Sequence, residues 1–325
     1  MTGANERPGR RVEPDRIAII GAGHVGATTA FALMLRALVH EIVLVDRNRA
    51  LAEAEAADLS DANALARPAR VWAGDYADAA RARIAILTAG GATHGAQDRL
   101  SVAADSAVIV ADCVEGLIQA GFSGILLVAA NPVDLMTLVA LKRSGLPASR
   151  VIGTGTLLDT SRLKQTLSEA LGVAPASIEG YVLGEHGNSE VAAFSTVRIG
   201  GQPLDRFCKD ADRPDLDAMS TEVRDAGYAI VEGKGYTSFG VATAIVRICE
   251  AILRDERAVL PVSTLLTGEY GLSGLCLSLP CVLGAEGVHR ILTPDLEPPE
   301  QAALAASAKI LRTAFAAIPV RATAD

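Results

Sequence analysis

Apolar residues in the first half of the chain form short runs separated by stretches of helical character. The runs are rich in Ile, Val and Leu, and the intervening stretches are rich in Ala and Leu. This alternation is typical of a parallel sheet wound with helices on both faces. The predicted strands are residues 16–20, 41–46, 69–74, 84–89, 124–130 and 151–155.

The pattern changes after about residue 156, where longer amphipathic helices alternate with pairs of strands. This half of the chain is predicted to be a mixed α+β domain. The expected organisation is a disordered tail (1–15), a doubly wound domain (16–155) and an α+β domain (156–325). The elements expected in the second half are helices at 159–171, 216–233, 238–254 and 300–318 and strands at 180–184, 191–200, 262–268 and 275–284.

Composition excludes several classes of protein. The 325 residues carry a formal net charge of -8, which disfavours binding to nucleic acid because that needs a basic face. No apolar run reaches membrane-spanning length, and the polar N-terminal stretch does not resemble a signal peptide. Five cysteines without a CxxC pair indicate a reducing compartment, and we expect a cytoplasmic protein.

A glycine motif, Gly21-Ala22-Gly23-His24-Val25-Gly26, follows the first predicted strand and precedes a helix expected at 27–38. In a Rossmann-type sheet this GxGxxG pattern lets a dinucleotide pyrophosphate approach the start of a helix. Alone the pattern is also compatible with an ordinary tight turn. Its position between strand and helix favours a dinucleotide site.

Asp46 strengthens this interpretation because it ends the second predicted strand, 20 residues after Gly26. A carboxylate there accepts hydrogen bonds from the adenine ribose hydroxyls and repels a 2′-phosphate, which favours NAD over NADP. Arg47 beside it leaves NADP open, because NADP sites use a neighbouring arginine. An Asp that merely starts a turn is the alternative reading.

Two further segments follow strands at the edge where open α/β sheets bind ligands. Residues 88–99 (TAGGATHGAQDR) are small, polar and glycine-rich, as in a mobile lid that delivers Arg99 on closure, although an exposed loop is an equal alternative. Asn131-Pro132 ends the fifth strand, where a cis bond is an option that would aim the Asn side chain into the crevice. A simple strand-ending turn is as good an explanation.

Three ionisable residues suggest acid-base chemistry. Asp159 and Arg162 are three residues apart on one helical face; such a pair is usually a solvated ion pair, but Arg162 could also bind a substrate carboxylate. His186, in Gly-Glu-His-Gly-Asn, could exchange a proton with a hydroxyl, with an aspartate fixing its tautomer. The histidines show no metal-ligand spacing, and no metal site is predicted.

Taken together, these motifs resemble the L-lactate/malate dehydrogenase family from residue 16 to residue 318. ANPVDLMT, VIGTGTLLDTSRL, GEHGNSE and GKGYTSFG are longer and more specific matches than the glycine motif. The resemblance implies an NAD-dependent oxidoreductase that transfers a hydride between the nicotinamide and a small 2-oxo or 2-hydroxy acid. It also implies a homotetramer or a homodimer.

Roles for individual residues follow from the same resemblance. It implies that His186 is the proton donor and acceptor, Asp159 its carboxylate partner, Arg162 the carboxylate clamp and Arg99 the lid arginine that polarises the carbonyl. Asn131 would contact nicotinamide and substrate, and Thr237 would line the substrate pocket. The cofactor would also contact His24, Val25, Tyr76, Ala89, Gly90, Gly91, Ala129 and Thr154.

Two departures from the family pattern concern the substrate. Thr93 aligns with a lid position that is an arginine in malate enzymes and a glutamine in typical lactate enzymes, and residues 91–98 contain no arginine. Asn188 stands where lactate enzymes usually have Asp, as in the L-2-hydroxyisocaproate dehydrogenase branch. L-Lactate/pyruvate is therefore the first expectation, longer 2-oxo acids are the alternative, and malate is less favoured.

Functions of other kinds are also compatible with the fold. NAD-dependent glycosidases share it but need a Cys and a His that hold a metal near the nicotinamide, and Ala129-Ala130-Asn131 offers no cysteine. A non-catalytic NAD-binding protein is a third reading. The joint presence of the four expected catalytic residues disfavours it.

Overall fold

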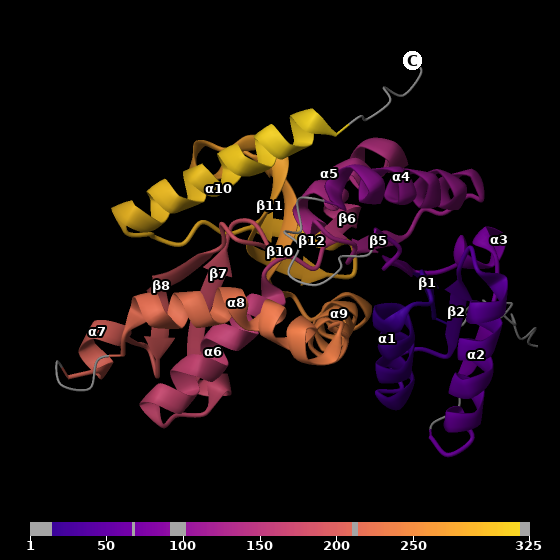
Figure 1. Cartoon of the computed structure of the whole chain (residues 1–325), viewed down its shortest axis with the longest axis horizontal. Helices are drawn as coiled ribbons and strands as arrows, with labels where there is room; N and C mark the ends of the chain where they lie inside the picture. The colour runs from indigo at the N-terminus through magenta and orange to yellow at the C-terminus, as the bar shows by residue number, and fades with distance from the viewer. Residues whose placement is uncertain (1–14, 67–68, 92–101, 210–213, 319–325) are drawn as a thin grey trace, which may run out of the picture.

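A nine-stranded sheet forms the centre of the computed structural model (Figure 1), which describes residues 15–66, 69–91, 102–209 and 214–318. The strand order is β12-β11-β10-β6-β5-β4-β1-β2-β3, with the six strands from β6 to β3 parallel and the other three antiparallel. Its strands are β1 (Arg16–Ile20), β2 (Glu41–Val45), β3 (Arg70–Ala73), β4 (Ile84–Leu87), β5 (Ile125–Val128), β6 (Val151–Gly153), β10 (Ala258–Thr267), β11 (Ser273–Gly284) and β12 (Gly287–Ile291).

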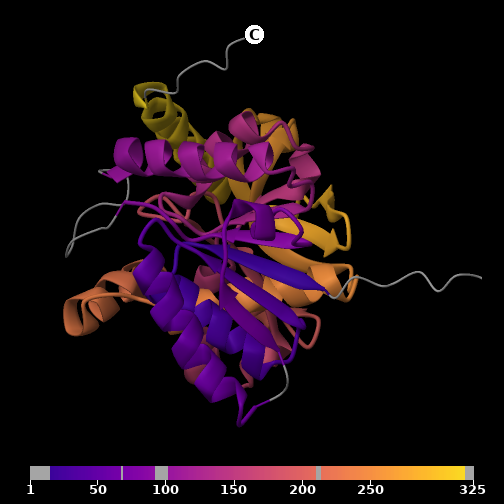
Figure 2. The ribbon, with the colours of Figure 1, turned by 90° about the vertical axis from the view of Figure 1, so that its right-hand side faces the viewer.

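The parallel strands are buried on both faces. Successive residues of β1 belong to two separate core clusters: Ile17 and Ile19 pack in one, Ala18 and Ile20 in the other. Helices from both halves of the chain cover these faces, with α4, α5 and α10 on one and α1, α2 and α9 on the other (Figure 2). Double coverage explains why the strands are continuous apolar runs and not alternating ones.

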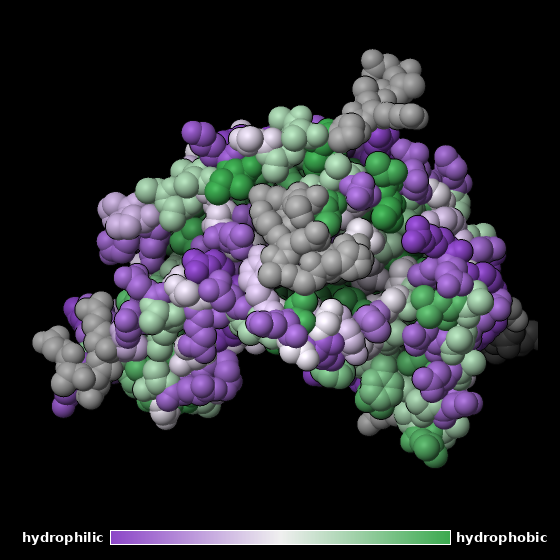
Figure 3. Space-filling model, viewed as in Figure 1, coloured by the Kyte–Doolittle hydropathy of each residue, from purple (hydrophilic) through white to green (hydrophobic). Residues whose placement is uncertain are grey.

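The helices that cover the sheet are amphipathic or wholly apolar, as their burial requires. On the face in Figure 3, hydrophobic residues are interspersed among hydrophilic ones over α1 and α2. The covering helices are α1 (His24–Leu35), α2 (Arg49–Asn63), α4 (Ala103–Gln119), α5 (Val133–Ser144), α9 (Phe239–Leu253) and α10 (Pro298–Ala317), with a short α3 (Tyr76–Ala79) and 3-10 turns at Ala148–Arg150 and Glu269–Gly271.

A second, three-stranded antiparallel sheet lies beside the first and has its own core. Leu163 and Leu167 of α6 pack with Val182 and with Met219 and Val223 of α8. This small core holds α6 and α8 in place. Its elements are α6 (Leu157–Leu171), a 3-10 turn (Pro175–Ser177), β7 (Ile178–Leu183), β8 (Val191–Ile199), β9 (Gln202–Pro203), α7 (Leu204–Phe207) and α8 (Leu216–Lys234).

The structure confirms the predicted α/β class, with small changes at element ends. The first helix was expected at 27–38, but α1 begins at His24 inside the glycine motif, because Gly23 takes the N-cap position. It ends at Leu35, and Ala37 has a left-handed φ of 48°. The strand β12 was not expected, and it continues the main sheet with β10 and β11 past the predicted domain boundary at residue 155. In the part of the chain that the structure describes, no helix could span a membrane.

One buried carboxylate joins several of these elements. Asp134, in the first turn of α5, is 1% exposed. Its Oδ1 accepts hydrogen bonds from the hydroxyls of Ser263 on β10 (2.6 Å) and Ser278 on β11 (3.3 Å), and its Oδ2 accepts one from the backbone N–H of His186 (2.8 Å). Burial raises the pKa of Asp134 to about 6, whereas the hydrogen bonds from Ser263 and His186 lower it. The turn after β7 is thereby attached to the main sheet.

Asp134→Asn tests the charge on this residue. The native pKa lies above that of an unfolded aspartate, so between about pH 4 and pH 7 the native state binds more protons and loses stability as pH rises. As pH rises over that interval, the unfolding free energy of the wild type should therefore fall relative to that of the variant. The expected loss is about 1.4 kcal/mol for each unit by which the native pKa of Asp134 exceeds its unfolded pKa. Chemical denaturation at several pH values measures it. Exposed Asp58→Asn is the control, and a wild-type-to-variant difference that is constant with pH would contradict the prediction.

Candidate active site

The glycine motif forms a close-packed turn between β1 and α1. Gly21 has a φ of 107°, and a Cβ there would lie 2.7 Å from the backbone nitrogen of Ala89. A Cβ on Gly26 would lie 1.9 Å from the carbonyl oxygen of Gly21. By contrast, a Cβ on Gly23 would have no atom within 4 Å, and no side chain caps α1. The start of α1 is therefore open to a phosphate, as a dinucleotide requires.

Asp46 lies beside this turn at the end of β2. Its Oδ2 accepts a hydrogen bond from the backbone N–H of Ala22 (2.7 Å), and its Oδ1 accepts one from that of Asn48 (2.8 Å). The carboxylate thus orients the glycine turn and faces a cavity that Arg47 also lines. Other residues of this cavity, which we call the adenosine cavity, are Gly21, Gly23, Val45, Leu51, Tyr76, Thr88, Ala89, Gly90, Ile109 and Cys113.

The adenosine cavity suits the adenosine half of NAD. Tyr76, Leu51 and Ile109 supply an apolar wall for a base, and Asp46 supplies an acceptor for ribose hydroxyls. Burial, together with Cys113 and nearby carboxylates, raises the pKa of Tyr76, which stays a neutral phenol. The cavity therefore offers an uncharged wall for the base and the Asp46 carboxylate, which favours NAD, beside the Arg47 side chain.

A second cavity lies where α6, α8 and α9 meet the ends of β5 and β6. Its volume is about 110 Å³, well below the 300–1,000 Å³ of typical drug-sized sites. We call it the catalytic pocket, and a small molecule is the ligand that fits it. Its lining residues are Val25, Ala129, Asn131, Thr154, Gly155, Leu158, Arg162, His186, Gly227, Tyr228, Val231, Thr237, Val241 and Ala244.

Three polar side chains form a connected group at this pocket. His186 Nδ1 lies 2.5 Å from Asp159 Oδ2, and Arg162 Nη1 donates to Asp159 Oδ1 at 2.9 Å. The Asp159 side chain is 2% exposed and that of Arg162 16% exposed, so this is not the solvated pair that an isolated i,i+3 spacing suggests. Because Asp159 occupies Nδ1, the Nε2 atom of His186 is left for other partners.

Helix α6 and the turn after β7 bring these groups together. Asp159 lies in the first turn of α6, and His186 follows β7 in a turn held at several points. Gly184 exchanges backbone hydrogen bonds with Ser278 (3.0 and 3.1 Å), and the N–H of Glu185 donates to the Ser307 hydroxyl (2.9 Å). With the Asp134 contact, these bonds leave the backbone of the turn little freedom.

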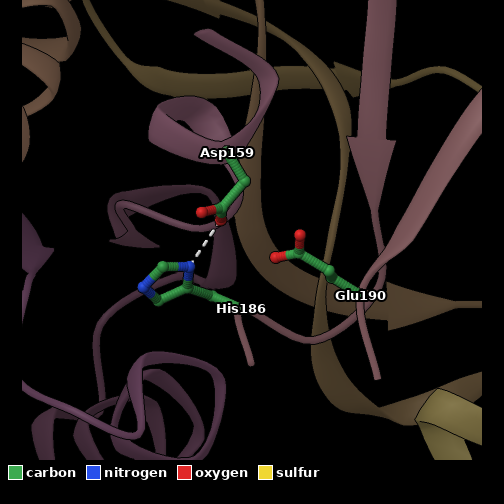
Figure 4. Close-up of side chains that lie close together, drawn as sticks. All are labelled: Asp159, His186 and Glu190. Atoms are coloured by element: carbon green, nitrogen blue, oxygen red, sulfur yellow. Dashed lines mark hydrogen bonds and ion pairs between the residues drawn. The ribbon is translucent and has the colours of Figure 1, made fainter. Parts of the chain in front are cut away.

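Glu190 also approaches this group (Figure 4). The ligand atoms of Asp159, His186 and Glu190 lie within 4.8 Å of one another, a spacing that a cation could use. However, both oxygens of Asp159 already bind Arg162 and His186. A metal would have to compete with the Arg162 guanidinium for the same carboxylate, so this group is better suited to acid-base work.

The predicted site residues are distributed over the two cavities. The adenosine cavity contains Gly21, Gly23, Asp46, Tyr76, Ala89 and Gly90, and the catalytic pocket contains Val25, Ala129, Asn131, Thr154, Arg162, His186 and Thr237. Asn131-Pro132 is cis. Gly26 is packed under the turn, and the N–H of Gly91 donates to Ser106 (3.1 Å). The predicted lid residues Thr93 and Arg99 lie outside the described residues.

Some residues of the site were not found by sequence reasoning. Asp134 was part of the motif ANPVDLMT but received no role, although a carboxylate in an apolar helix is a signal of a buried anchor. Tyr228 and Gly227 of α8 line the catalytic pocket, and the Tyr228 hydroxyl donates to Asn188 Oδ1 at 2.9 Å. Nothing in the local sequence marks α8 as a pocket wall.

Comparison with known proteins agrees with this geometry. Residues 15–153 match the NAD binding domain of lactate/malate dehydrogenase, and residues 156–318 match the alpha/beta C-terminal domain of the same family. The L-lactate dehydrogenase of Moorella thermoacetica is 44% identical over 308 residues, which is 93% of this chain and 97% of that protein. That of Priestia megaterium is 40% identical over 300 residues, 91% and 94% of the two chains.

A solved structure has the same fold over nearly the whole chain. The minor L-lactate dehydrogenase from Enterococcus mundtii, in a ligand-bound form, superposes with a TM-score of 0.90 at 38% identity and covers 94% of this chain and 99% of its own. Both halves of the chain are thus matched together. The protein belongs to the lactate/malate dehydrogenase family.

Proposed function

We propose that the protein is an NAD-dependent L-2-hydroxyacid dehydrogenase that interconverts pyruvate and L-lactate. The observation that carries the proposal is the His186-Asp159-Arg162 group, which lines a small pocket next to a turn suited to a dinucleotide. The relatives named L-lactate dehydrogenase support the choice of substrate. The family match to an NAD binding domain supports the cofactor.

Each residue of the group has a defined task in pyruvate reduction. Arg162, held by Asp159, binds the substrate carboxylate with its remaining N–H groups. This places the C2 carbonyl beside His186, whose Nε2 donates a proton to the carbonyl oxygen. Bound NADH supplies the hydride that C2 accepts. Asp159 stabilises the protonated imidazole beforehand and keeps the proton on Nδ1 of the neutral ring afterwards.

The remaining assigned residues would position the reactants. Asn131, at the end of β5, and Thr237 reach the pocket from the two halves of the chain. Val25 provides an apolar contact between the cofactor turn and the pocket. We assign Arg99 the polarisation of the carbonyl from the resemblance alone. In lactate oxidation the same groups act in reverse, with His186 accepting the hydroxyl proton.

A dehydrogenase for longer 2-oxo acids is the second candidate. Gly227 lies within α8 where that helix lines the catalytic pocket, and a glycine places no side chain there. Glycine is a poor helix residue, and its presence in the wall favours a wider pocket. A dicarboxylic substrate is less favoured, since Arg162 is the one arginine or lysine among the described residues that line the pocket.

A panel of 2-oxo acids tests the proposal. Purified protein with NADH should give its highest kcat/KM with pyruvate, compared with 2-oxobutanoate, 2-oxo-4-methylpentanoate, phenylpyruvate and oxaloacetate, measured by absorbance at about 340 nm. Preference for the longer acids would support the second candidate. Oxidation of NADH by none of the acids would refute both.

Arg162→Lys tests the carboxylate clamp. A lysine keeps the positive charge but cannot form the bidentate contact, so KM for pyruvate should rise about 10- to 100-fold, the range expected for a hydrogen bond to a charged group. NADH affinity, measured by calorimetry, should be unchanged. Arg290→Lys, an exposed arginine on β12, is the control. An unchanged KM would remove Arg162 from substrate binding.

We also propose that the enzyme acts in the cytoplasm as a homo-oligomer. Among the described residues, Cys113, Cys249, Cys276 and Cys281 form no disulfide, which suits a reducing compartment. Phe31 and Leu35 of α1 are 42% and 53% exposed, and Phe239 of the adjoining α9 is 71% exposed. Apolar side chains gathered in this way mark an interaction surface, which a second copy of the chain would cover.

Sedimentation velocity measures the assembly directly. At micromolar concentration the protein should sediment as a dimer or tetramer, and Leu35→Glu should shift it toward the monomer because it places a charge in the contact. A matched change on an exposed residue elsewhere, Val259→Glu on β10, should not. Wild-type protein that sediments as a monomer would contradict the proposal.

A further inference from the structure

Two aromatic rings from distant parts of the chain stack between the cofactor turn and the catalytic pocket. The His24 imidazole and the Tyr236 phenol lie with their centroids 3.8 Å apart and their planes 10° from parallel. His24 is the first residue of α1, inside the glycine motif. Tyr236 lies in the short connection between α8 and α9, which belong to the C-terminal domain of the family.

Both rings are adjacent in sequence to residues of the pocket wall. Val25 follows His24, Thr237 follows Tyr236, and both Val25 and Thr237 line the catalytic pocket. Moving either ring would therefore move a wall residue. Neither ring lines the pocket itself, so their contribution to catalysis would be through Val25 and Thr237.

Lys234 also contacts the segment that carries Tyr236. Lys234 Nζ lies 4.4 Å from the centroid of the Tyr236 ring and 3.9 Å from that of Phe239, and 3.5 Å from the Ser238 hydroxyl. These contacts are all between residues of the same short stretch, 234–239. Gly235, with a φ of 89°, ends α8 in the left-handed conformation, and its N–H donates to the carbonyl of Val231. The stack with His24 joins this segment, and with it Thr237, directly to the glycine turn.

We propose that the His24-Tyr236 stack is a positioning contact that couples the dinucleotide-binding turn to the wall of the substrate pocket. It rests on the proposed function, since it assumes that the turn binds NAD and the pocket a 2-oxo acid. Binding at one side holds both rings, and so favours binding at the other. Such coupling is reciprocal between the two ligands.

Because the coupling is reciprocal, a variant on the cofactor turn should affect pyruvate, and a variant beside the pocket should affect NADH. His24→Ala, on the cofactor turn, should raise KM for pyruvate. Tyr236→Ala, on the pocket side, should weaken NADH binding in calorimetric titration of the protein without substrate. A stacked aromatic pair corresponds to changes of about two- to tenfold. The double variant should be no worse than the worse single variant, because either change already removes the stack.

Matched variants separate stacking from other roles of these residues. Tyr236→Phe keeps a ring that can stack on His24, and it should stay close to wild type in KM and in NADH affinity. His40→Ala, at an exposed histidine before β2, controls for the loss of an imidazole. Thermal unfolding of the protein without ligands adds a readout independent of activity, in which the double variant should again equal the worse single variant.

Independent effects would overturn the proposal. They would appear as single-variant effects that multiply in the double variant, or as variants that each change only the ligand on their own side. If wild type reduces no 2-oxo acid, the proposed function fails by itself. The effect of Tyr236→Ala on NADH affinity would then still decide whether the stack acts on the cofactor turn.

Discussion

The hydrogen bond from the backbone N–H of His186 to the buried carboxylate of Asp134 determines where the reactive imidazole lies. Asp134 in turn accepts hydrogen bonds from hydroxyls of β10 and β11. The turn after β7 is therefore attached to the main sheet as well as to its own small sheet. A carboxylate that is buried away from solvent must accept hydrogen bonds from such donors, or it becomes protonated and loses its charge. The position of the imidazole that we propose as proton donor thus depends on a residue that does not line the catalytic pocket.

The other half of the reactive group comes from a separate layer. Asp159 and Arg162 belong to α6, which packs through Leu163 and Leu167 on the small core with α8. The geometry of the His186-Asp159 contact therefore depends on how the small sheet and its helices pack against the main sheet. Because Arg162 shares the same carboxylate, the proposed substrate clamp and the proposed proton donor depend on a single aspartate.

Residues with an obligatory local role could be recognised from the sequence. The glycine motif and Asp46 are close in the chain to the strands that they end, and parallel strands bring their carboxyl ends to one edge. His186, Asp159 and Arg162 were identified only through the long family motifs. Their local spacing left solvated or structural roles open, since no short-range pattern states that α6 and the turn after β7 meet.

The sequence by itself determined the α/β class, most of the strands and helices, and the dinucleotide turn, because these follow from hydrophobic periodicity and from backbone requirements of nearby residues. Only the tertiary structure decided that β10, β11 and β12 extend the main sheet, that Asp134 anchors His186, and that Tyr236 stacks on His24. Each of these joins residues more than 50 positions apart. Such contacts arise from the packing of whole elements, which local sequence does not encode.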